Sequence, residues 1–245
     1  MAQRIVLVHP DAATTATMIA GRLLASVQEA VALRGEAHVA LTGGSMGSAL
    51  VAALADHPAV DVVDWSRVHV WWGDERWLPL GDPDRNDTQN DSAGLDRLPL
   101  DPARVHRVPG PDTSESPEAA AIAYERALRV DGGGSWDVVL LGVGPDGHVA
   151  SLFPGHPAQL RDDALAIAVH DSPKPPPIRV SLTLGCLARS HEVWFVVAGA
   201  DKAEAVAKGV SGAPAQESTA AQLQALGRTL WLVDEAAASR LSRLT

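Results

Sequence analysis

The sequence predicts an α/β fold, a single domain built on a doubly wound, mostly parallel sheet. Short apolar runs of strand length alternate with helical patterns, which is the order that a parallel sheet with covering helices produces. The chain has 245 residues, and 46% of them are hydrophobic, which is ample for one large core. We find no internal repeat and no dividing linker, and therefore expect residues 1–245 to form one domain.

The expected elements follow one another in a regular order. The first helix is expected to begin after Asp11 and to end at Gly35, because the apolar positions between them fall on one face. Residues 81–102 are rich in Asp, Pro and Asn and are expected to form a long irregular loop. Strands are expected at 5–9, 38–41, 67–72, 136–141, 164–170, 178–184, 192–198 and 228–233. The remaining helices are expected at 47–56, 117–130, 202–208 and 235–241.

Composition excludes several classes of partner. The formal charge of −10, from 30 acids and 20 bases, argues against nucleic acid and against attraction to anionic membranes. An anionic ligand would therefore need a local basic site. Cys186 is the single cysteine, so no intramolecular disulfide is possible. We see no signal sequence and no run of about 20 apolar residues, so a cytoplasmic protein without membrane association is expected.

The most informative segment is 140–155, which reads LLGVGPDGHVASLFPG. An apolar strand enters a glycine-rich turn that carries Asp146 and His148. Histidine suits proton transfer near neutral pH, and such strand ends are where open α/β sheets bind their ligands. Two other interpretations are open: a purely structural turn capped by Asp146, and a dinucleotide-binding loop. The dinucleotide loop is disfavoured because it requires a following helix, which Pro154 and Pro157 prevent.

A second glycine-rich turn, TGGSMGS at 42–48, follows another predicted strand and opens a helix. Free backbone N–H groups at a helix start favour a phosphate, so Gly43, Gly44 and Ser45 are candidate phosphate-binding residues. The segment lacks the Gly-Lys-Ser/Thr of a Walker A loop. An ordinary glycine-serine turn is the alternative.

Charged residues gather at two more places. Asp74, Glu75 and Arg76 follow the strand at 67–72, and either acid is a candidate to face a pocket; a solvated loop with a local ion pair is the alternative. Lys174 and Arg179 lie in a stiff loop with four prolines, SPKPPPIR, which suits a phosphate clamp. A polyproline recognition motif is the alternative there.

Together these segments resemble the 6-phosphogluconolactonase family. The matching motifs are LTGGS, WWGDERWLP with Asp84-Arg85-Asn86 behind it, GVGPDGHVASLFPG and SPKPPPIRVSLTL, in the family's order and over nearly the whole chain. The resemblance implies a fold like that of glucosamine-6-phosphate deaminase and hydrolysis of 6-phospho-D-glucono-1,5-lactone in the pentose phosphate pathway. The family's phosphate loop usually reads SGGSTP, so Thr42, Met46 and Gly47 depart from it.

The candidate residues fit this chemistry. His148 would act as general base and then general acid. Asp146 would orient it or a neighbouring loop, and Arg76 would stabilise the oxyanion or bind the substrate's hydroxyls. Asp74 is a candidate second base. Gly43, Gly44, Ser45, Lys174 and Arg179 would hold the phosphate. No metal and no cofactor is required, and we expect a monomer whose partner is a small sugar-phosphate lactone.

Two rival functions remain. In the isomerase and deaminase branch of the resembling family, a glutamate five residues after the histidine assists ring opening. Phe153 occupies that place here, and a phenyl ring cannot transfer a proton. The second rival is a sugar-phosphate sensor of the kind found in transcriptional regulators, which carry a DNA-binding segment ahead of the fold. The first expected strand begins at Ile5 and the chain is acidic, so the enzyme is favoured.

Overall fold

The fold is built on a six-stranded sheet whose strands all run parallel, in the order β1-β9-β8-β5-β2-β3. The computed structural model describes residues 3–132 and 134–241. Every strand carries a run of apolar side chains, as expected for strands covered on both faces. The six are β1 (Gln3–His9), β2 (Ala37–Leu41), β3 (Val68–Trp72), β5 (Val138–Leu141), β8 (Glu192–Val197) and β9 (Arg228–Asp234).

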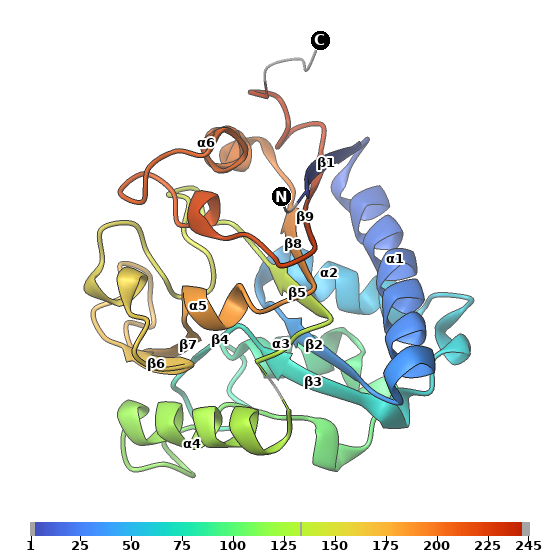
Figure 1. The fold of residues 1–245 in the computed structure, drawn as a ribbon, viewed down its shortest axis with the longest axis vertical. Helices are drawn as coiled ribbons and strands as arrows, with labels where there is room; N and C mark the ends of the chain where they lie inside the picture. The colour runs from blue at the N-terminus through green and yellow to red at the C-terminus, as the bar shows by residue number, and fades with distance from the viewer. Residues whose placement is uncertain (1–2, 133, 242–245) are drawn as a thin grey trace.

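Helices cover both faces of this sheet (Figure 1). On one face, α1 and α2 pack with the sheet into one apolar cluster. On the other face, α4, α5 and α6 belong to a second cluster, which contains Trp71, Phe195 and Trp231. The longer helices are α1 (Ala12–Arg34), α2 (Gly44–Ala55), α3 (Asn86–Ala93), α4 (Pro117–Val130) and α6 (Ala203–Ser211), and the single turn α5 spans Leu184–Leu187. The predicted α/β class with a mostly parallel sheet is confirmed.

A small antiparallel sheet stands beside the main one, in the order β4-β7-β6. Its strands are β4 (Asp74–Arg76), β7 (Arg179–Leu182) and β6 (Ala166–Val169). The two strands that flank the proline-rich loop therefore pair with each other and with the segment that leaves β3. This sheet brings the Asp74 segment next to the Arg179 segment.

The strand order reverses between β2 and β5. From β2 the chain moves outward to β3 on one side, and β5, β8 and β9 follow on the other. Open α/β sheets bind ligands outside the carboxyl ends of the strands at such a switch point. The loops after β2 and β5 meet there, because the Thr42 hydroxyl accepts a hydrogen bond from the Gly142 N–H at 3.3 Å.

Three expectations from the sequence were wrong. Residues 81–102 contain helix α3, so they are not a uniformly irregular loop. Helix α2 begins at Gly44 rather than at residue 47. Residues 235–241 form turns instead of a helix, since the Asp234 carboxylate accepts from both the Gly199 and the Ala237 N–H groups and holds the chain in a tight cap.

Helix α1 is long and apolar, and it packs within the domain. At 23 residues it is long and apolar enough to cross a bilayer by length and composition alone. One face, including Ile19, Leu23 and Val27, is buried in the cluster shared with α2 and the sheet. This is the position of a core helix in a layered domain.

Candidate active site

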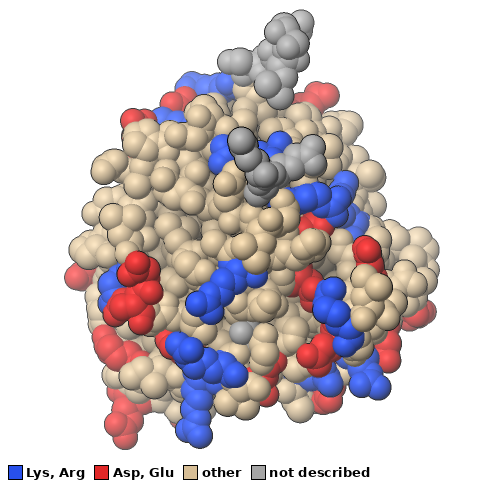
Figure 2. Space-filling view, in the orientation of Figure 1, with Lys and Arg blue, Asp and Glu red and all other residues tan. Residues whose placement is uncertain are grey.

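An open cleft of about 260 Å³ lies at the switch point. Its wall comes from the loops after β2, β5 and β8, from β4, from the start of α3 and from the proline-rich loop. The lining residues carry four cationic side chains and one carboxylate, so the cleft is basic in a chain whose net charge is −10. They are Thr42, Gly43, Gly44, Asp74, Arg76, Asn86, Gly142, Val143, Gly144, His148, Ala150, Lys174, Pro175, Arg179 and Lys202. Figure 2 shows that acids and bases are interspersed on one outer face.

His148 is held by Asp146 on the turn after β5. The Nδ1 atom lies 2.5 Å from the Asp146 carboxylate, and the ring is 13% exposed. The turn closes through hydrogen bonds from the Gly144 N–H to the His148 carbonyl at 3.0 Å and from the Gly147 N–H to the Gly144 carbonyl at 2.8 Å. A Cβ atom on Gly144 would overlap the imidazole. The chain then forms a bridge between Val149 and Leu152 instead of entering a helix.

Electrostatics keep Asp146 ionised. Burial alone would raise the pKa of its carboxyl group, but the hydrogen bond with His148 and the charge of Lys174 outweigh burial and hold that pKa well below its usual range. Lys174 Nζ lies 3.7 Å from Asp146 and 3.4 Å from His148 Nδ1. Since Nδ1 faces a carboxylate at 2.5 Å, it carries the proton, and Nε2 is left as the basic nitrogen.

The opposite side of the imidazole packs on an apolar ring. The centroids of His148 and Phe153 are 4.5 Å apart, and Phe153 is 2% exposed. The Arg179 guanidinium lies 5.9 Å from the centroid of the same ring. Phe153 therefore supports His148 and Arg179 by packing and offers no titratable group.

The start of α2 offers backbone donors to the cleft. Gly43 and Gly44 line the cleft, and no side chain among the described residues caps the helix. Gly44 has a φ of 76°, a conformation that favours glycine. Ser45, which was predicted with them, is exposed and is not among the lining residues. Met46 and Gly47, where the chain departs from the family pattern, are both buried.

The sequence did not show whether Asp74 or Glu75 faces the pocket, and strand β4 points their side chains in different directions. Asp74 faces the cleft, where its carboxylate accepts from the Ser151 hydroxyl at 2.6 Å. Glu75 points away from the cleft and is fully buried. Burial and the neighbouring Asp87 raise the pKa of Glu75 to about 8. Asp74, rather than Glu75, is therefore the acid available to a ligand.

The two predicted arginines of the site differ in how many hydrogen bonds their guanidinium groups make within the protein. Arg76 donates to the Asp84 carbonyl, while its buried Nε has no hydrogen-bond partner among the described residues. Arg179 is 4% exposed and donates to the carbonyls of Pro176 at 3.1 Å, Lys174 at 3.0 Å and Pro175 at 3.2 Å. Most of its donors therefore hold the proline-rich loop in shape.

Lys202 and Asn86 were not among the predicted site residues, although Asn86 belongs to a segment that matches the family's motifs. Lys202 follows β8, so its place at the carboxyl end of a parallel strand was the available signal. Asn86 begins α3 and donates to the Asp74 backbone carbonyl at 2.8 Å and to its carboxylate at 3.3 Å. It lay inside the stretch that was expected to be irregular.

A cluster of side chains of metal-ligating types lies at the opposite end of the parallel strands, where β2 and β3 begin. Glu36, His38 and His69 place one ligand atom each within 4.8 Å of one another. Trp71 donates to His38 Nδ1 at 3.3 Å, whereas metal-bound histidines usually donate from their second nitrogen. Arg104 contacts His69 Nε2 at 2.5 Å. These nitrogens are thus used in hydrogen bonds within the protein.

The fold and the cleft together define a class: an α/β enzyme with a histidine–aspartate pair and a glycine-rich helix start at a topological switch point. Comparison with known proteins makes the class specific. The sequence profile described as Glucosamine-6-phosphate isomerases/6-phosphogluconolactonase matches residues 10–231, and the chain belongs to that family. The resemblance predicted from the motifs is confirmed, as is the prediction of a hydrolytic enzyme.

Individual relatives agree with this family assignment. The chain is 51% identical to a 6-phosphogluconolactonase of Streptomyces coelicolor over 97% of this chain and 94% of the relative. It is 41% identical to a 6-phosphogluconolactonase of Mycobacterium tuberculosis over 96% and 97%. A crystal structure of 6-phosphogluconolactonase from Thermotoga maritima has the same fold, with a TM-score of 0.83 at 24% identity over 95% of this chain and all of that one. A monomeric glucosamine-6-phosphate deaminase also shares the fold, with a TM-score of 0.80 at 20% identity over 96% and 99%.

Proposed function

We propose that this protein hydrolyses 6-phospho-D-glucono-1,5-lactone to 6-phosphogluconate, a step of the oxidative pentose phosphate pathway. The full-length similarity to 6-phosphogluconolactonases supports the proposal. The observation that carries it is the contact of 2.5 Å between His148 Nδ1 and Asp146 in a cleft lined by four cationic side chains. Lactone opening needs a base, an oxyanion site and an acid, and these groups can supply all three.

In the proposed mechanism, His148 Nε2 takes a proton from water while Asp146 stabilises the imidazolium that forms. The water oxygen attacks the lactone carbonyl carbon, and Arg76 stabilises the negative charge that develops on the carbonyl oxygen. The bond between that carbon and the ring oxygen then breaks, and His148 returns the proton to the ring oxygen. Asp74 accepts a hydrogen bond from the attacking water as a second base.

The phosphate would bind at the start of α2, in the same cleft as this chemistry. The N–H groups of Gly43 and Gly44 and the dipole of α2 favour an anion there. Lys174 and Arg179 add charge, and we include Lys202 because its side chain reaches the same cleft. Ser45 would contribute its backbone N–H rather than its exposed hydroxyl.

The same proposal covers partners and location. The set of His148, Asp146 and Arg76 completes the reaction without a metal ion or an organic cofactor. We further propose that residues 1–245 act as one domain, as a monomer in the cytoplasm, with a small sugar-phosphate lactone as ligand and with neither nucleic acid nor a membrane as partner. Light scattering of the purified protein tests the monomer.

An assay with freshly generated lactone tests the function. Proton release in a pH-stat, corrected for spontaneous hydrolysis, should rise in proportion to the amount of enzyme. Glucosamine 6-phosphate should release no ammonia, because Phe153 cannot move a proton during ring opening. Steady ammonia release at a comparable rate would indicate the isomerase branch instead. Binding of 6-phosphogluconate without lactone turnover would indicate a sensor.

A further inference from the structure

Asn86 connects the two functional halves of the cleft. Its amide nitrogen donates to the Asp74 backbone carbonyl at 2.8 Å and to the Asp74 carboxylate at 3.3 Å. Its amide oxygen packs so closely on Gly43 that a Cβ atom there would overlap it. The side chain is 2% exposed, although it reaches the cleft wall. One buried amide thus touches both the acid of the site and the loop with the backbone donors.

Glu75 fixes the backbone that carries Asn86. Its side-chain oxygens accept from the Asn86 N–H at 2.7 Å and from the Asp87 N–H at 2.9 Å, the first donors of helix α3. They also accept from the Arg76 N–H at 2.8 Å. A carboxyl group at the N-terminus of a helix satisfies donors that have no partner within the helix. This single buried side chain therefore ties the start of α3 to strand β4.

We propose that Glu75 and Asn86 are positioning residues, which hold Asp74 at a fixed place relative to the phosphate loop at Gly43. The inference rests on the proposed lactone hydrolysis, in which Asp74 acts on the water and Gly43 on the phosphate. Glu75 acts through the start of α3, and Asn86 acts through its bonds to Asp74. Neither side chain performs chemistry on the substrate.

A positioning role predicts a specific kinetic pattern. Removing the Asn86 amide leaves Lys174 and Lys202 to bind the phosphate, so KM should change by less than about threefold. Asp74 would lose its fixed geometry, and small misplacements of a reacting group lower the rate strongly. We expect Asn86→Ala to lower kcat by about 10- to 100-fold and Glu75→Gln to lower it by about tenfold. A merely structural role would lower the melting temperature without this split between kcat and KM.

Glu125→Gln is the matched control. Glu125 in α4 also accepts a backbone N–H, that of Leu165 at 3.0 Å, and its side chain is 19% exposed. The same substitution removes the same kind of acceptor at a place that does not line the cleft. Its melting temperature should fall, while kcat and KM stay at the wild-type values.

The experiment measures kcat, KM and melting temperature for the wild type and the three variants, together with the side-chain amide signals of Asn86 by NMR. These signals are identified by their loss in Asn86→Ala, and they should shift in Glu75→Gln and stay in place in Glu125→Gln. A wild type without lactonase activity contradicts the proposed function, and the amide signals then still test the link from Glu75 to Asn86. An active wild type with unchanged kcat in Asn86→Ala overturns the inference, even if Glu75→Gln does not fold.

Discussion

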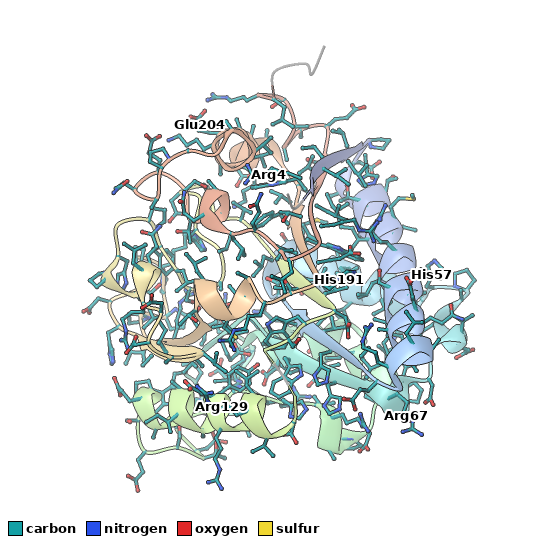
Figure 3. All side chains as sticks on the ribbon, viewed as in Figure 1. Arg4, His57, Arg67, Arg129, His191 and Glu204 are labelled. Atoms are coloured by element: carbon teal, nitrogen blue, oxygen red, sulfur yellow. The ribbon has the colours of Figure 1, made fainter. Side chains whose placement is uncertain are left out.

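Histidines lie beside acids and arginines at both ends of the parallel strands, but their surroundings differ. We call the end where the strands finish the carboxyl edge of the sheet and the end where they begin the amino edge. At the carboxyl edge, His148 is a single ring in an open cleft with one close acid partner. At the amino edge, His38, His69 and His106 stack on one another, with ring centroids 4.4 Å and 5.2 Å apart. Arg67 and His191, which precede β3 and β8, also mark this edge and are labelled in Figure 3.

Hydrogen bonds fix the protons of the stacked rings. Arg104 always donates, so His69 Nε2 accepts from it and the His69 proton lies on Nδ1. That proton points to His106 Nε2 at 2.9 Å. Burial lowers the pKa of all three rings, that of His106 to about 4. The difference between the edges is that both ring nitrogens of His69 have partners within the protein, whereas His148, the proposed base, lines an open cleft with Nδ1 held by Asp146.

The largest expected effect is the loss of His148. His148→Ala should lower kcat by about 10²- to 10⁴-fold, because general acid–base groups contribute that much, with little change in KM. His106→Asn is the control from the amino edge and should lower stability while leaving kcat intact. Turnover close to that of the wild type in His148→Ala, measured above the spontaneous rate, would end the proposed role.

A smaller effect is expected from the cleft cations. Lys174→Ala and Lys202→Ala should each weaken 6-phosphogluconate binding by roughly 10- to 100-fold, since a charged hydrogen bond contributes about 1.5–3 kcal/mol. Arg179→Ala should weaken it at least as much, because the proline-rich loop also loses its clamp. Calorimetry measures these affinities. Lys208→Ala is the control, since Lys208 pairs with Glu217 at 3.2 Å on the surface; equal losses in all four variants would contradict a local phosphate site.

The amino edge predicts a dependence of stability on pH. In the folded protein His106 stays neutral down to about pH 4, whereas an unfolded histidine takes up a proton near pH 6.5. The unfolded chain therefore binds more protons between these values, and the free energy of unfolding should fall as the pH drops from 6.5 toward 4. The slope is about 1.4 kcal/mol per pH unit for each such histidine. Urea unfolding at several pH values measures it, and His106→Asn should flatten the curve; an unchanged slope would show that other groups cause it.

The smallest effect is expected from chelation. Dialysis against a strong chelator should leave kcat and the melting temperature unchanged, because the proposed mechanism uses His148, Asp146 and Arg76 without a metal ion. The measurement also examines the amino edge, where Glu36, His38 and His69 lie within 4.8 Å. Loss of activity that zinc or magnesium restores would reassign His148 as a ligand. A lower melting temperature with full activity would instead point to an ion at the amino edge.

The sequence predicted the α/β class, most strands and the turn that carries Asp146 and His148, because glycine turns after apolar runs are local signals. It did not predict α3, since Asn, Asp and Ser are poor helix formers and the helix start is stabilised by Glu75, a tertiary contact. Lys202 was assigned only to a helix, because no local pattern shows that the end of β8 reaches the cleft. The order of the strands decides that.

One glycine has a consequence for how the chain tolerates change. Gly144 carries no chemistry, yet any side chain there would occupy the volume of the His148 ring. In a mutational scan scored by growth that depends on the oxidative pentose phosphate pathway, position 144 should tolerate substitution as poorly as position 148. Its variants should nevertheless accumulate as folded protein, because the overlap displaces a side chain that faces an open cleft. A collection of inactive but abundant variants would thus mark the neighbours of the proposed catalytic ring as clearly as the ring itself.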